Sequence, residues 1–217
     1  CQRKALELNP GQLSALNNMG SLLRERKERE EAIVYYRQAL QIAPGYLEAM
    51  NNLGSVLVEL ERPDEALSLL LKVVQAQPDH PDAHNNIANA MLIKESFDKA
   101  LFGYRKALAF RPGHREALLG LARALFGNDQ PDQALPVCQH ALEMMSEKPE
   151  AHVLLGDIQT KLENYDAARS AYEYALSINA ESLGAYLGLG QLQMELGQLD
   201  VSKMSFQYAM EIDPKEL

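Results

Sequence analysis

The residues of this chain best suited to chemistry are its histidines, because imidazole binds metals and titrates near neutral pH. The chain has five of them: His80, His84, His114, His140 and His152. His80 and His84 are four residues apart, a spacing that can place two ligands on one helical face. Pro81 lies between them at an expected helix start, which disfavours a shared face. We therefore expect the histidines to pack or to face solvent, with no metal site.

The cysteines offer little further chemistry. Cys1 and Cys138 are the only two, too few for a disulfide framework or a four-cysteine zinc site. No repeating acid or base stands beside Cys138, so we expect a buried, unreactive thiol there. The sequence also lacks phosphate-binding glycine loops and the HExxH zinc motif. These observations predict no cofactor and no enzymatic activity, and the cysteine usage favours a reducing, cytoplasmic setting.

The overall charge limits the class of partner. The formal net charge is -9 and the isoelectric point is about 5.1, whereas a nucleic-acid surface needs clustered cations. The chain has no run of about 18 apolar residues, the length at which a membrane span is considered. We therefore expect a protein or peptide partner, with no nucleic acid and no membrane insertion.

The elements that must position any site are repeats of 34 residues. The segment ALNNMGSLL at Ala15 returns as AMNNLGSVL at Ala49 and as AHNNIANAM at Ala83, then in looser form three more times. A fixed period of this length indicates a repeat array. We predict a single solenoid over 1-217, with the end of a preceding repeat at 1-12 and six full repeats at 13-46, 47-80, 81-114, 115-148, 149-182 and 183-216.

The opening segment CQRKALELNP lacks the apolar middle of a secretory signal, and Ala5 and Pro10 match the closing positions of later repeats. We expect the chain to be a fragment, from which an address or a neighbouring domain has been removed.

Each repeat has the pattern of two helices. Apolar residues at positions 4, 7 and 11, such as Leu16, Met19 and Leu23, form one stripe of a first helix. An acidic residue at position 18 then suits the start of a second helix. Positions 8, 20 and 27 hold mostly small residues, such as Gly20, which allow two helices to approach closely. No repeat shows sustained strand alternation, so the expected fold is all-α.

These residues resemble the tetratricopeptide repeat family, which has small residues at positions 8, 20 and 27, an aromatic residue near 24 and a proline at 32. The aromatic position holds Tyr36, Tyr104, Tyr172 and Phe206. The resemblance implies a right-handed α-solenoid of antiparallel helix pairs, the tetratricopeptide superhelix. Leu70 and Cys138 depart from the aromatic pattern. Pro136 falls inside a second helix, where we expect a local bend.

In the family that the chain resembles, the first helices line a concave groove. This implies peptide-binding residues at or near their groove positions: Asn17, Asn18, Asn51, Asn52, Asn85, Asn86, Asn89, Leu92, Ile93, Arg123 and Phe126. We expect Phe126 to be an apolar anchor and Arg123 to orient an acidic neighbour in the partner. The alternative is that neighbouring repeats cover these apolar residues.

Asn18, Asn52 and Asn86 occupy position 6 of successive repeats, where their amides could grip a partner's backbone as a ladder. The alternative is that they bond within the scaffold. Acids at position 2, such as Glu48 and Asp82, could likewise form a ridge for a basic peptide. Their alternative role is to complement the helix dipole.

Two functions follow from the sequence. The first is a non-catalytic scaffold that binds an extended peptide or a partner helix in its groove. The second is the substrate-recognition arm of a larger, glycosyltransferase-like enzyme, since the repeats resemble those that precede the catalytic region of O-GlcNAc transferase. We do not expect binding of chaperone C-terminal tails, because the clamp positions of the first three repeats lack the cations that this mode requires.

Overall fold

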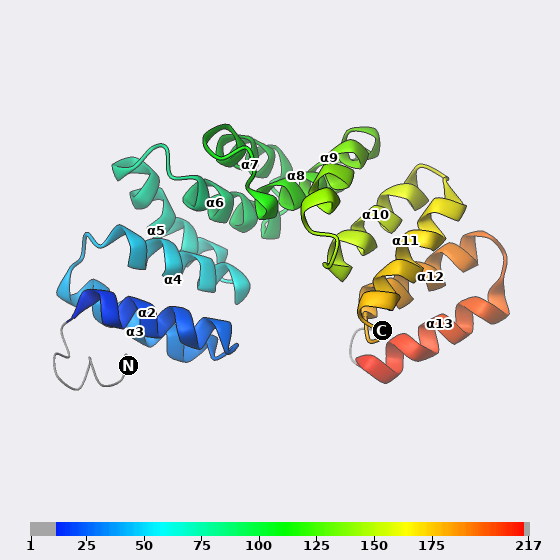
Figure 1. Ribbon diagram of the computed structural model, residues 1–217, viewed down its shortest axis with the longest axis horizontal. Helices are drawn as coiled ribbons and strands as arrows, with labels where there is room; N and C mark the ends of the chain where they lie inside the picture. Colours follow the sequence, from blue (N-terminus) through cyan, green and yellow to red (C-terminus); the bar gives the residue numbers. More distant parts are fainter. Residues whose placement is uncertain (1–11, 215–217) are drawn as a thin grey trace. The chain divides into compact units, whose positions relative to one another are not determined.

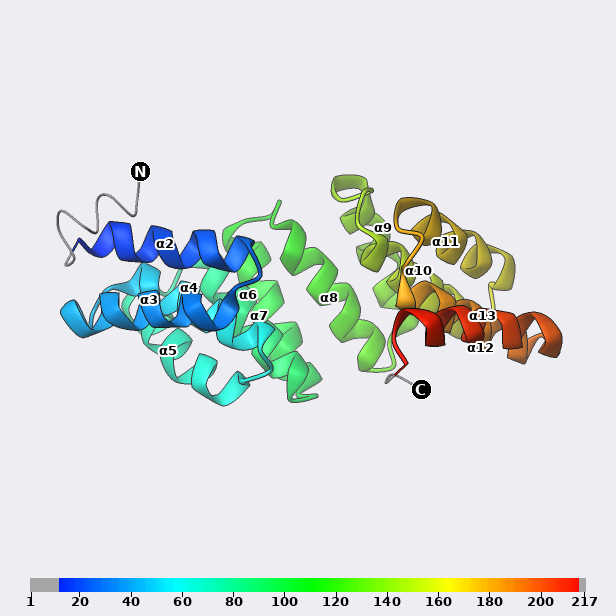
Figure 2. The ribbon, with the colours of Figure 1, turned by 90° about the horizontal axis from the view of Figure 1, so that it is seen from below.

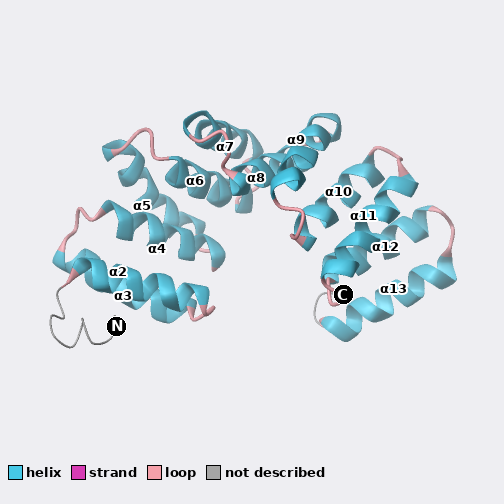
Figure 3. Cartoon of the chain, viewed as in Figure 1, coloured by secondary structure: helices cyan, strands magenta, loops and turns pink. Residues whose placement is uncertain are grey.

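The computed structural model describes residues 12-214, and all regular structure in that range is helical (Figure 3). The described residues fall into two compact units that meet between His114 and Arg115. We describe each unit by itself. No helix within this range combines the length and the apolar character that crossing a membrane requires. The predicted end of a preceding repeat, 1-12, lies almost wholly outside the described residues.

The described residues of the first unit form three antiparallel helix pairs (Figures 1 and 2). We call the first helix of each pair the A helix and the second the B helix. The pairs are α2 (Leu13–Glu25) with α3 (Arg29–Ile42), α4 (Leu47–Glu59) with α5 (Pro63–Ala76), and α6 (Pro81–Ile93) with α7 (Phe97–Phe110). Within this unit, α4 also packs against both α2 and α6.

The second unit repeats this arrangement. Its pairs are α8 (Arg115–Gly127) with α9 (Pro131–Met144), α10 (Pro149–Lys161) with α11 (Tyr165–Ile178), and α12 (Leu183–Glu195) with α13 (Leu199–Ile212). The predicted fold class, an all-α solenoid of antiparallel helix pairs, is confirmed. Pro136 lies inside α9 and does not interrupt it.

The turn from each A helix to its B helix uses one residue with positive φ. These residues share position 15 and are Lys27, Glu61, Glu95, Asp129, Glu163 and Gly197. A left-handed residue is a common way to end a helix, and glycine adopts it at least cost. Gly197 is the glycine of this set, and the other five repeats have lysine, glutamate or aspartate at position 15. The turn geometry is therefore imposed by packing of the two helices rather than by glycine.

Close packing within a pair depends on position 8. A Cβ added to Gly20 would lie 2.6 Å from Cε1 of Tyr36, and one added to Gly156 would lie 2.4 Å from Cε1 of Tyr172. The Tyr36 side chain is fully buried and that of Tyr172 is 2% exposed. The small residue therefore makes room for the ring at position 24, as the sequence pattern predicts.

We expect Gly20→Ala to destabilise the protein by about 1 to 3 kcal/mol, because the buried Tyr36 ring must move to admit a methyl group. Gly45→Ala is the matched control, since a Cβ there meets nothing within 4 Å. The urea unfolding midpoint should fall for Gly20→Ala and stay level or rise slightly for Gly45→Ala. Equal midpoints in the two variants would contradict the close-packing account.

Candidate functional site

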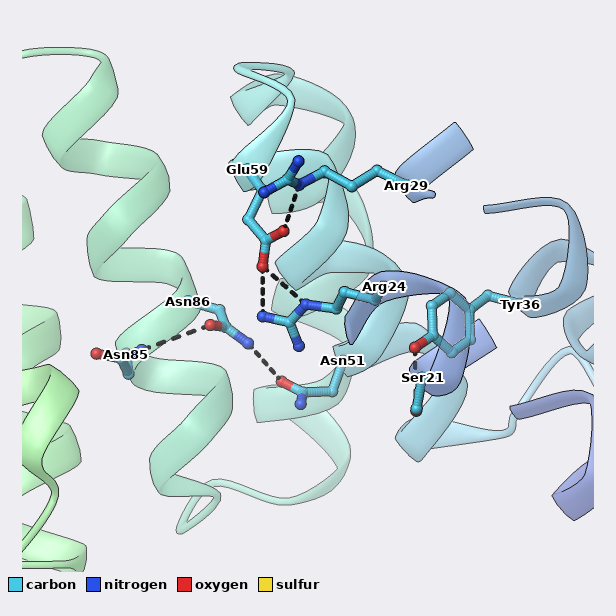
Figure 4. Close-up of polar contacts among 8 residues, drawn as sticks. All are labelled: Ser21, Arg24, Arg29, Tyr36, Asn51, Glu59, Asn85 and Asn86. Atoms are coloured by element: carbon cyan, nitrogen blue, oxygen red, sulfur yellow. Dashed lines mark hydrogen bonds and ion pairs between the residues drawn. The ribbon is translucent and has the colours of Figure 1, made fainter. Parts of the chain in front are cut away.

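The A helices of the first unit are joined by hydrogen bonds between asparagine side chains. Asn52 Nδ2 donates to Asn17 Oδ1 at 3.0 Å, and Asn86 Nδ2 donates to Asn51 Oδ1 at 3.1 Å. In both bonds, position 6 of one repeat donates to position 5 of the repeat before it. We call Asn17, Asn51, Asn52, Asn85 and Asn86 the asparagine relay; Figure 4 shows its second half. The relay holds α2 to α4 and α4 to α6.

The two ends of the relay differ. Asn17 Nδ2 donates to Glu48 Oε1 at 2.9 Å, which closes the relay at α2 and α4. At the other end, Asn85 Nδ2 lies 3.5 Å from Asn86 Oδ1, while the buried Asn85 Oδ1 has no hydrogen-bond partner among the described residues. In the sequence, position 6 of the next repeat is Gly120, which has no amide to donate. The repeated pair of asparagines at positions 5 and 6 therefore ends with the third repeat.

These bonds support the alternative that the asparagines bond within the scaffold. Asn17, Asn85 and Asn86 are 1%, 6% and 7% exposed, so little of their side chains can reach a partner. Two members of the predicted ladder of Asn18, Asn52 and Asn86 have a donor engaged within the scaffold, because Asn52 donates to Asn17 and Asn86 donates to Asn51. Asn18 is exposed and Asn51 and Asn52 are half-buried. Peptide binding stays a prediction for these three.

The tyrosines at position 24 reach the same side of the helix pairs. Their hydroxyls bond to position 9 of the A helix: Tyr36 with Ser21 at 3.1 Å, Tyr104 with Asn89 at 2.6 Å and Tyr172 with Asp157 at 2.8 Å. Figure 4 shows the first of these bonds. Asn89, which the sequence assigned to peptide binding, therefore has one acceptor occupied by the scaffold.

The other three repeats have no hydroxyl at position 24, which leaves position 9 without this bond. Their position-9 residues are Ser55, Arg123 and Gln191. Arg123 is exposed, and its guanidinium forms no hydrogen bond or ion pair with the described residues. Binding of a partner by Arg123 stays a prediction.

The charged residues of the first unit are largely paired. Glu59 on α4 accepts from Arg24 Nε at 2.7 Å and from Arg29 Nε at 2.8 Å (Figure 4). Glu48 is used by Asn17, and Asp82 accepts from both terminal nitrogens of Arg111 at 2.7 and 3.0 Å. Two acids of the predicted position-2 ridge are therefore engaged within the scaffold. Such exposed pairs contribute about 0 to 1 kcal/mol each.

The second unit contains a pocket of about 520 Å³ bordered by its three A helices. Its lining comprises Phe126 of α8, Asp157, Thr160 and Lys161 of α10, Glu163 of the turn that follows, Tyr165 and Tyr172 of α11, and Gly188, Gln191 and Glu195 of α12. A Cβ added to Gly188 would lie 2.4 Å from Cε1 of Tyr172. The absent side chain at Gly188 thus leaves the Tyr172 ring as part of the pocket lining.

Of the predicted apolar contacts, only Phe126 lines this pocket. Leu92 is half-buried and Ile93 is 41% exposed at the end of α6, in the first unit. The remaining pocket residues were not predicted. The sequence contained one signal for them, the acid Asp157 at position 9 of a repeat that has Tyr172 at position 24.

Asp157 is a half-buried acid in the lining of the pocket. Burial raises the pKa of its carboxyl group, while the hydrogen bond from Tyr172 and the charge of Arg123 lower it to a smaller extent. Burial also raises the pKa of the Tyr172 hydroxyl, which therefore stays protonated and donates. The pocket cation, Lys161, already pairs with Asp129 at 3.1 Å.

The histidines and Cys138 are engaged locally. His80 Nδ1 accepts from the Ala83 backbone N–H at 3.2 Å, and His84 Nε2 lies 2.7 Å from the Pro78 carbonyl oxygen. The described residues include no cluster of three or more histidine, cysteine, aspartate or glutamate side chains placed to hold a metal. The Cys138 side chain is fully buried, and burial raises the pKa of its thiol to about 12.

Comparison with known families agrees with this architecture. The sequence profile of the tetratricopeptide repeat matches residues 23–90 and 160–201. That of the anaphase-promoting complex, cyclosome, subunit 3, matches residues 93–175. The chain belongs to the tetratricopeptide repeat family. No curated protein matches its sequence.

Several solved structures share the fold. The Cut9–Hcn1 hetero-tetramer of the APC/C matches with a TM-score of 0.92 at 15% identity, over 100% of this chain and 43% of that chain. PilF of Pseudomonas aeruginosa matches with a TM-score of 0.75 at 19% identity, over 93% and 92%. YrrB, described as having an unusual peptide-binding site, matches with a TM-score of 0.52 at 20% identity, over 100% and 94%. At these identities the similarity shows the fold alone.

We expect Asn17→Ala to destabilise the protein by about 1 to 3 kcal/mol, because it leaves the amide of Asn52 without its acceptor in a partly buried site. Asn18→Ala is the matched control, since Asn18 is the exposed neighbour and alanine is the better helix former. Urea unfolding should separate the two variants. If both unfold at the wild-type midpoint, the relay contributes nothing to the scaffold.

We expect Cys138 to resist iodoacetamide at pH 8 in the folded protein, because a buried thiol with a pKa of about 12 forms almost no thiolate there. Mass spectrometry of the peptide that contains Cys138 should show alkylation only after unfolding in urea. Rapid alkylation of the native protein would mean that the side chain is accessible.

Proposed function

We propose that this chain is a non-catalytic scaffold that binds an extended peptide or a partner helix on the side formed by its A helices. The pocket in the second unit carries this proposal, because it is bordered by α8, α10 and α12 and lined by Phe126. A concave site with an aromatic side chain and a few polar groups is typical of ligand recognition. The peptide-binding site described for YrrB, which has the same fold, supports this use of the architecture.

The two units offer different contacts to such a partner. In the second unit, Phe126 supplies apolar surface and Gly188 makes room for the Tyr172 ring, which also lines the pocket. In the first unit, the accessible amides of Asn18, Asn51 and Asn52 can match the donors and acceptors of an extended backbone. We propose that the six repeats, 13-46 to 183-216, form one binding module.

The net charge of -9 favours proteins over nucleic acids as partners. Acidic chaperone tails do not suit the first unit, because Arg24 and Arg29 are already paired with Glu59. A reducing, cytoplasmic setting fits the fully buried, unreactive Cys138 thiol. The alternative role, substrate recognition for a larger transferase, would use the same A-helix side.

Selection of random peptides on the whole chain tests the scaffold function. We expect Phe126→Ala to weaken the selected peptides at least about tenfold, because a desolvated aromatic anchor carries much of the binding energy. Phe102→Ala is the control, since Phe102 is 64% exposed on the B helix α7. Isothermal titration should show an unchanged affinity for that variant.

Equal loss of affinity in both variants, or loss in neither, would contradict binding at the A-helix side. A thermal melt of Phe126→Ala separates the two roles of the residue. A large fall in melting temperature with unchanged affinity would make Phe126 part of the repeat core.

A further inference from the structure

The pocket of the second unit is rich in carboxylates. Asp157, Glu163 and Glu195 line it, against the single ammonium group of Lys161. That ammonium group is already paired with Asp129, which does not line the pocket. A ligand group inside the pocket would therefore meet an excess of negative charge.

Only one oxygen of the Asp157 carboxylate accepts a hydrogen bond from the described residues. Its Oδ1 accepts from the Tyr172 hydroxyl at 2.8 Å, and that hydroxyl also lies 3.3 Å from Thr160 Oγ1. No hydrogen bond from the described residues reaches Oδ2. Because the Asp157 carboxyl group is partly buried, an incoming donor with a positive charge would stabilise the anion.

The walls of the pocket suit a long cationic side chain. Phe126 and Tyr165 are half-buried aromatic residues that line it, and an aromatic face attracts ammonium and guanidinium groups. Lysine and arginine also have methylene stems that pack along such apolar surface. A Cβ at Gly188 would lie 2.4 Å from Cε1 of Tyr172, so the missing side chain makes room for the Tyr172 ring, whereas the same repeat position in the first unit holds Asn52.

We propose that this pocket binds a lysine or arginine side chain of the partner peptide, with Asp157 and Glu195 facing the cation and Phe126 packed along its stem. The proposal rests on the scaffold function and names the chemistry of its partner. A lysine or arginine side chain supplies both the positive charge and the apolar stem that this pocket suits, which favours a protein chain as the source of the cation.

An acidic side chain fits the pocket less well. Arg123, which the sequence analysis assigned to an acidic neighbour, does not line the pocket and is exposed on α8. An acid that entered would face three carboxylates and find the pocket ammonium already paired. An acidic residue of the partner can instead follow the basic one and meet Arg123 outside the pocket.

The test begins with random 12-residue peptides displayed on phage and selected in parallel on two proteins. These are the wild-type chain and the double variant Asp157→Asn, Glu195→Gln. Asparagine at 157 should keep the tyrosine bond, since Asn89 accepts from Tyr104 at 2.6 Å in the third repeat. We expect lysine or arginine to be enriched at one peptide position on the wild type and not on the double variant.

A matched pair of peptides then measures the contribution of the cation. Norleucine has the same carbon stem as lysine without the ammonium group. Replacing the enriched lysine by norleucine should lower affinity about tenfold for the wild type and at most about twofold for the double variant. Glu173→Gln is the control, because Glu173 is exposed on α11 and does not line the pocket. It should keep the tenfold loss.

The outcomes separate the two proposals. Selected peptides that depend on Phe126 but show no preference for lysine or arginine would overturn the basic-side-chain proposal and leave the scaffold function intact. Failure to enrich any peptide would overturn the scaffold function itself, and the pocket proposal with it.

Discussion

The close contact between position 8 of the A helix and position 24 of the B helix governs much of this structure. At Gly20 and Gly156 even one added carbon would collide with the tyrosine ring that fills the space. The contact fixes how near the two helices lie, and it directs the tyrosine hydroxyl toward position 9. Packing between the two helices therefore determines which polar residues of the A helix the tyrosine hydroxyls reach.

The two units use this common frame differently at position 6. In the first unit, Asn52 and Asn86 fill that position and bond to the preceding repeat, which makes a connected polar surface. In the second unit, Gly188 takes the place and a pocket forms above Tyr172. The same repeat thus yields asparagines that bond to one another in one unit and a pocket in the other, and a partner gains more from the pocket.

The helices were predictable because their signals are local and periodic. The contacts between repeats could not be predicted, because they depend on how the helices stack. The sequence places asparagines at positions 5 and 6, yet only the stacking of α2 and α4 shows that Asn17 is buried and Asn18 exposed. Asn17 and Asn52 are 35 residues apart, and their bond depends on the helix stacking rather than on either helix alone. The pocket was missed for the same reason, since its lining comes from four helices.

Chemical-shift mapping tests the central claim most directly, that partners bind on the A-helix side of the second unit. A selected peptide would be titrated into the whole chain labelled with ¹⁵N. The largest amide shifts should cluster at pocket residues of α8, α10 and α12, such as Phe126, Thr160 and Gly188. Shifts confined to the B helices, around Phe102 or Glu173, would contradict the account.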